Sequence, residues 1–163
     1  MDKPRSTQGV TLPSPASHPE MAARRRGAEW ARAVVSQAMS RPVLTIDVTE
    51  TLWDAWQLLS VSGLRHLAVV EDGRCLGVIS DRMILTDIPV SEDRMRARGV
   101  GELLSRGPLR SVRDTSPLAD VARMMARYSA EAVPVLDDLD RLVGIVTGSD
   151  LVRWWADEAA ARP

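Results

Sequence analysis

The chain has 163 residues, a formal net charge of −1, 45% apolar residues and one cysteine. This length fits one compact domain or two small intertwined halves, with enough apolar residues for a core. The near-neutral charge gives no overall field to recruit nucleic acid or a membrane. A single cysteine excludes an intramolecular disulfide and a four-cysteine metal site. With no signal peptide and no membrane-spanning apolar run, we expect a cytoplasmic protein.

Residues 1–26 are predicted to form a disordered tail, because they hold four prolines among polar residues and little apolar surface. The tail ends in Arg24–Arg26, which could contact phosphate but is more typical of a solvated helix start, so nucleic-acid binding is not expected. The apolar pattern over residues 27–39 predicts a leading amphipathic helix that docks on the core.

A first repeat is predicted over residues 27–86. Strands are expected at 43–46, 66–70 and 76–79, and Asp72–Gly73 fits a hairpin turn. A helix with one buried stripe follows the first strand, and Ser80 caps a second helix. The stripe residues recur at helical spacing: Leu52, Ala55, Trp56 and Leu59. Residues 87–99 read as a polar connector.

The same order of elements recurs over residues 100–158, followed by a short C-terminal tail at 159–163. Ser116 is predicted to cap a helix that starts at Pro117, and Leu118 begins a stripe 66 positions after its first-repeat equivalent. Pro134 places its strand at a sheet edge or removes one ladder bond. We therefore predict an α/β (α+β) fold of two strand–helix–strand–strand–helix repeats, packed with pseudo-twofold symmetry.

Thr147 and Asp150 follow the last apolar strand, three residues apart at a helix start. One interpretation is a helix cap, with the hydroxyl and the carboxylate satisfying the first backbone N–H groups. The other is a ligand site, in which both groups fix a sugar diol above the helix N-terminus. Because this stretch occurs in both repeats, the ligand-site interpretation gains weight.

The repeated pattern resembles a tandem pair of CBS domains, also called a Bateman module. The resemblance covers about Val35 to Trp155 and is carried by two lead-ins, V-S-Q-A-M-S-R-P-V and V-G-E-L-L-S-R-G-P-L, and by E-A-V-P-V-L-D-D. The paired endings G-V-I-S-D-R-M and G-I-V-T-G-S-D complete it. Proteins of this family bind adenosine-containing ligands between two domains, usually as sensors rather than enzymes.

The resemblance implies that Thr147 and Asp150 hold the ribose. In the first repeat Ser80 matches the pattern, but Met83 stands where the aspartate would be, so we expect one competent cleft and one weakened or empty cleft. The alternative is that Met83 is a core residue. The adenine is expected beside Val112, Ala132 and Val133 with Ser111 near the base or ribose, unless these residues are plain core. Phosphate candidates are Arg153, Arg82, Arg65 and Arg127, each also readable as a solvated arginine.

We therefore expect a regulatory module, not an enzyme, that binds AMP, ADP or ATP, or less favourably S-adenosylmethionine or NAD, and acts on an unknown protein effector. The alternative is a ligand-free interaction or oligomerisation module. No residue pattern indicates a catalytic or metal site, and no cofactor is required. Trp154 and Trp155 point in different directions on one helix, so one is expected to pack inward and the other to face a second copy in a homodimer.

Overall fold

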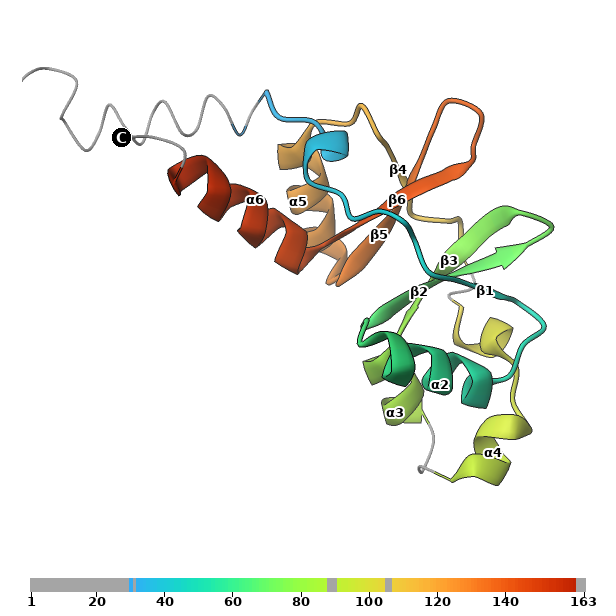
Figure 1. Cartoon of the computed structure of the whole chain (residues 1–163). Coiled ribbons are helices and arrows are strands. Elements are labelled where there is room, and N and C mark those ends of the chain that lie inside the picture. The colour runs from blue at the N-terminus through green and yellow to red at the C-terminus, as the bar shows by residue number, and fades with distance from the viewer. Residues whose placement is uncertain (1–29, 31, 88–90, 105–106, 161–163) are drawn as a thin grey trace, which may run out of the picture.

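The structure is a computed structural model that describes residues 30, 32–87, 91–104 and 107–160. The predicted tail over 1–26, with Arg24–Arg26, lies outside these residues, and so do positions 161–163 of the predicted C-terminal tail. Figure 1 shows two lobes joined through their sheets, with helices on the outside of each lobe.

The first repeat forms a three-stranded sheet in the order β1-β2-β3, in which β1 and β2 are parallel and β2 and β3 are antiparallel. The hairpin between β2 and β3 turns at Asp72 and Gly73, both with positive φ, as the sequence predicts. The elements are β1 (Thr45–Asp47), α2 (Leu52–Ser62), β2 (His66–Glu71), β3 (Arg74–Ser80) and α3 (Asp81–Asp87).

The second repeat has the same order and the same pairing in its sheet β4-β5-β6. Even the irregularity in register recurs, between Val69 and Val70 and between Val135 and Leu136. This confirms the α/β fold of two strand–helix–strand–strand–helix repeats. The elements are β4 (Val112–Arg113), α5 (Leu118–Tyr128), β5 (Ala132–Leu136), β6 (Leu142–Thr147) and α6 (Gly148–Ala160).

The two lead-in segments are exchanged in space. The segment with the 3-10 helix η2 (Val35–Gln37) precedes β1 but packs on the second repeat, where the Val35 N–H donates to Ser116 O at 2.9 Å. The segment with η3 (Val100–Leu103) precedes β4 but packs on the first repeat, where the Val100 N–H donates to Glu50 O at 2.8 Å. Figure 1 shows this crossing: the blue lead-in lies beside α5.

This exchange completes both hydrophobic cores. Val35 is buried in the core formed around α5, β5 and β6, and Val100 is buried in the core formed around α2, β2 and β3. A third, smaller cluster contains residues of both repeats and ties the sheets together. It consists of Ala68, Cys75 and Leu136, with Val43, Leu109 and Leu142 packed against them.

Two predicted helical features are wrong. Residues 27–29 and 31 of the predicted leading helix lie outside the described residues, and the predicted helix does not run to 39, because Val34 is extended and bridges to Pro117. Ser116 is not the cap of α5: Pro117 occupies that position, and the Ser116 hydroxyl accepts a hydrogen bond from the Arg113 N–H at 3.0 Å.

The connector and Pro134 also differ from expectation. The connector contains a short helix, α4 (Glu92–Arg96), whose Met95 is fully buried in the first core. β5 is the central strand of its sheet, so the edge alternative for Pro134 is wrong. The proline lies just before the β4–β5 pairing begins, and its register partner Ile145 instead exchanges backbone hydrogen bonds with Ser40.

The close approach of the lead-in to β6 generates a stability prediction. A Cβ at Gly144 would overlap the sulfur of Met39 and also crowd its Cβ. We expect Gly144→Ala to lower the free energy of unfolding by about 1–3 kcal/mol in urea unfolding, because the Met39 side chain must leave its packed position. Gly148→Ala is the matched control, since nothing lies within 4 Å of its added Cβ. A Gly144→Ala protein as stable as the wild type would contradict the prediction and show that the packing of Met39 against β6 contributes little to stability.

Candidate functional site

Thr147 and Asp150 form a reciprocal cap at the start of α6. The Thr147 N–H and hydroxyl donate to Asp150 Oδ2 at 2.8 and 2.7 Å, and the Asp150 N–H donates to Thr147 Oγ1 at 3.2 Å. The cap interpretation of this pair is therefore confirmed as geometry. It does not compete with a ligand role, because a capped carboxylate keeps free lone pairs.

The other carboxylate oxygen of Asp150 is held by Ser40, a residue that the sequence did not single out. The Ser40 hydroxyl donates to Asp150 Oδ1 at 2.8 Å, and Arg153 Nη1 lies 3.5 Å from the same oxygen. Only 4% of Asp150 is exposed. Ser40 belongs to the exchanged lead-in, so an acidic group of the second repeat is bonded by the segment that leads into the first. The sequence shows that the lead-in is repeated, but it does not show that each lead-in packs on the other repeat, so Ser40 could not be assigned to this site.

The residues predicted to surround the adenine are dispersed. Val133 is 1% exposed in the second core, and Val112 is partly buried against the same core, so both contribute to packing whether or not they also contact a ligand. Ser111 precedes β4 and does not line the described cleft, whereas Ala132 does. Ala132 also pairs with Thr147 in the β5–β6 register, so β5 connects the predicted site to the cleft.

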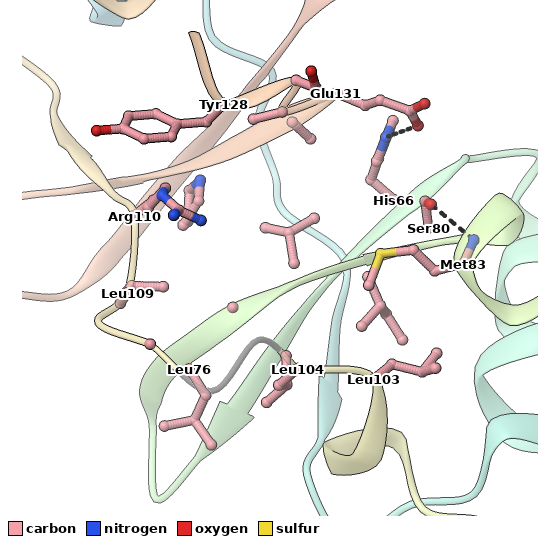
Figure 2. Close-up of a pocket in the computed structure, with 18 of the residues that line it drawn as sticks. His66, Leu76, Ser80, Met83, Leu103, Leu104, Leu109, Arg110, Tyr128 and Glu131 are labelled. Carbon is pink, nitrogen blue, oxygen red and sulfur yellow. Dashed lines mark hydrogen bonds and ion pairs between the residues drawn. The ribbon is translucent and has the colours of Figure 1, made fainter. Parts of the chain in front are cut away.

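A cleft of about 560 Å³ opens between β3 and the start of β5. Figure 2 shows Arg110 and Tyr128 at one end and His66, Glu131 and Met83 at the other, with Leu76, Leu104 and Leu103 along the wall between them. Of the predicted site residues, Ser80, Arg82 and Ala132 line it, and Thr147, Asp150 and Arg153 do not. The described cleft therefore lies on the side of the first repeat's incomplete ribose pattern.

Met83 has two roles in this cleft. Its thioether lines the wall, and the side chain also packs against the first core, as the core alternative predicts. The Ser80 hydroxyl, which is buried, accepts the Met83 N–H at 3.2 Å, so Ser80 caps α3 as Thr147 caps α6. The difference between the two helix starts is the missing carboxylate.

A charged cluster bridges the repeats at the mouth of the cleft. Arg82 Nη1 lies 3.0 Å from Glu131 Oε1, and His66 Nε2 lies 3.9 Å from Glu131 Oε2. The His66 side chain is only 17% exposed, and Nε2 has no hydrogen-bond partner. Burial lowers the pKa of His66 below its ordinary value, and the attraction of Glu131, Asp81 and Asp150 opposes that shift, whereas Arg65 adds to it.

The described residues show neither a metal site nor a membrane-spanning helix. No group of three or more His, Cys, Asp or Glu side chains among residues 30, 32–87, 91–104 and 107–160 could hold a metal ion. No helix in that same part of the chain is both long enough and apolar enough to cross a membrane.

Comparison with known proteins matches this architecture. The sequence model described as "CBS domain" matches residues 35–89 and 100–157, one match in each repeat. A CBS domain-containing protein of Dictyostelium discoideum is 34% identical over 131 residues, which cover 74% of this chain and 90% of the relative. Seven further curated relatives are longer, and the chain spans between 23% and 47% of their lengths.

Solved structures agree. The CBS domain pair of protein MJ0100, in complex with 5′-methylthioadenosine and S-adenosyl-L-methionine, has a TM-score of 0.66 at 26% identity, covering 77% of this chain and 98% of that one. The CBS-pair protein CBSX2 of Arabidopsis thaliana has a TM-score of 0.67 at 26% identity, covering 80% and 98%.

The environment of His66 generates a pH prediction. The native state keeps the imidazole neutral below its usual pKa, whereas the unfolded chain takes up the proton near pH 6.5. The unfolded state therefore binds more protons, and stability falls as the pH decreases through about 6.5. We expect the wild type to lose free energy of unfolding between about pH 7.5 and 5.5, and His66→Gln to lose less. Urea titrations across this range measure both slopes, and identical slopes would contradict the prediction.

Proposed function

Because this chain belongs to the CBS domain family, with one domain in each repeat, we propose that it is a regulatory module for an adenosine-containing ligand. The ligand class is AMP, ADP or ATP, with S-adenosylmethionine and NAD as less favoured members. The ligand binds between the two repeats, and the bound state is transmitted to a protein effector. We propose no catalytic activity for the module and a cytoplasmic location, which the free thiol of Cys75 fits.

The observation that carries this proposal is the buried carboxylate of Asp150. A carboxylate accepts hydrogen bonds from both hydroxyls of a ribose, and the helix N-terminus beneath it tolerates nearby phosphate. Thr147 already orients this carboxylate through two hydrogen bonds. Arg153, whose guanidinium lies 3.5 Å from Asp150 Oδ1, is exposed and can turn toward a phosphate. The similar MJ0100 domain pair, which binds two adenosine compounds, supports the ligand class.

Transmission follows from the position of Ser40. A ribose hydroxyl that approaches Asp150 Oδ1 competes with the Ser40 hydroxyl for the same oxygen, at 2.8 Å in this structure. Ser40 also exchanges two backbone hydrogen bonds with Ile145 of β6. Displacing its side chain therefore loosens the lead-in from the second repeat, and the ligand shifts the orientation of the two repeats through that segment.

Two substitutions test the site in opposite directions. Asp150→Asn removes the charge and one acceptor and should weaken AMP binding about tenfold or more. Ser40→Ala removes the competing donor and should tighten AMP binding roughly threefold to tenfold. Isothermal titration calorimetry with AMP, ADP, ATP, S-adenosylmethionine and NAD measures both, with GMP as the control ligand. Asp157→Asn, an exposed carboxylate on the same helix, is the control variant.

Each outcome has a distinct meaning. Unchanged binding in Asp150→Asn would place the ligand elsewhere. Weaker binding in Ser40→Ala would make the serine a direct ligand contact and overturn the competition step. If the folded wild type binds none of the five compounds, the alternative function stands: a ligand-free interaction or oligomerisation module.

We also propose that the module forms a homodimer through the outer face of α6. Trp154 packs against the second core, and Trp155 is 44% exposed beside Val152, as expected for adjacent helix positions. The Trp30 ring contacts both tryptophans, at centroid distances of 5.4 and 5.9 Å. Trp155→Ser should convert a dimer to monomers in sedimentation velocity, because it removes an apolar anchor. Tyr128→Ser, at an exposed aromatic on α5, is the control, and a wild type that sediments as a monomer would contradict this proposal.

A further inference from the structure

We propose that the cleft between β3 and β5 binds a small amphipathic carboxylate, an apolar chain or ring with one anionic headgroup, and not a nucleoside. This site is separate from the Thr147–Asp150 cap and does not rest on the function proposed for that cap. Its ligand class follows from what its walls can and cannot bond.

The middle of the cleft offers almost nothing to a sugar. Figure 2 shows Leu76, Leu104 and Leu103 along the wall that leads from Arg110 to the Met83 thioether, and Val78 also lines the cleft. The one buried hydroxyl, Ser80 Oγ, already accepts the Met83 N–H. A ribose placed here would leave hydroxyls without partners, which costs free energy when they are buried.

The acidic lining is confined to one end of the cleft. Glu131 is the one carboxylate among the described lining residues, and it faces Arg82 at 3.0 Å and His66 at 3.9 Å. Its charge is balanced by these first-repeat groups and does not extend to the apolar middle of the cleft. Between Glu131 and Arg110, the described lining therefore offers no carboxylate to a ribose diol.

Arg110 supplies the complementary charge. Its guanidinium lies 4.4 Å from the centroid of the Tyr128 ring, and among the described residues it has no carboxylate within ion-pair distance. Figure 2 shows it at the end of the cleft opposite Glu131. Stacking on an aromatic ring fixes the planar fork while leaving its N–H groups for a carboxylate, which it can bind through two hydrogen bonds.

The dimensions agree with this ligand class. A volume of about 560 Å³ lies within the range typical of small-molecule sites, which are mostly apolar with a few placed polar groups. A carboxylate head on Arg110 directs an attached chain along the leucines toward Met83. Apolar burial then supplies affinity, and Arg110 supplies orientation and selectivity for an anion.

Octanoate and 1-octanol form a matched pair of probes that share a chain and differ in charge. The reporter is the methyl resonance of Met83 in the full chain labelled at methionine methyl groups, assigned by its loss in Met83→Leu. We expect octanoate to shift this resonance saturably and to bind at least about fivefold more tightly than 1-octanol. AMP should not displace octanoate from this cleft.

Variants separate the headgroup contact from the apolar contact. Arg110→Gln should weaken octanoate about fivefold and leave 1-octanol unchanged. Arg123→Gln, an exposed arginine on α5 outside the cleft, is the control. Equal binding of the two probes, or an Arg110→Gln variant that keeps the selectivity, would overturn the proposal.

The same titration in Asp150→Asn distinguishes this proposal from the proposed function. Octanoate binding should be unchanged there, because Asp150 does not line the cleft. Loss of octanoate binding in Asp150→Asn would place the ligand at α6 and overturn the cleft assignment. Loss of AMP binding alone concerns the adenosine site and leaves the cleft assignment supported.

Discussion

Each repeat is too small to bury its own hydrophobic core completely. The exchanged lead-in segments cover the apolar surface that each repeat leaves exposed. A three-stranded sheet with a short amphipathic helix leaves apolar area uncovered, which a domain of this size cannot tolerate. Val35 covers the second repeat and Val100 covers the first, both fully buried and both tied by backbone hydrogen bonds of 2.8–2.9 Å. The repeats are therefore parts of one folding unit, because neither core is complete without chain from the other half.

The same exchange determines what the candidate sites can be. Asp150 is bonded by Ser40, and the apolar cleft is walled by Leu104, in both cases by a lead-in that belongs in sequence to the other repeat. A ligand at either place consequently contacts the connection between repeats as well as a helix start. In the proposed function, this geometry gives a physical route from occupancy to relative orientation, because each lead-in contacts both a site and the other repeat.

The sequence predicted the repeated fold because periodicity, turn chemistry and the spacing of Leu52 and Leu118 all report local structure. It also predicted the cap at Thr147, because a cap depends on residues only three positions apart. It missed Ser40, because that contact depends on which lead-in reaches which repeat, and local sequence patterns carry no signal for contacts 110 positions apart. Met95 was missed for a related reason: the few apolar residues of the connector do not recur at a helical spacing.

The two helix starts share a capping hydroxyl, and the residue at the third helical position sets the difference in their chemistry. At α6 the third residue is Asp150, whose carboxylate concentrates charge where the helix dipole favours it and draws in a hydroxyl from Ser40. At α3 it is Met83, which leaves the cap to the serine hydroxyl alone and extends the apolar wall toward Leu104. A pseudo-symmetric pair therefore presents a polar, closed site and an apolar, open one. Since binding energy at each depends on groups the other lacks, the two sites can respond to different compounds while sharing one mechanical connection.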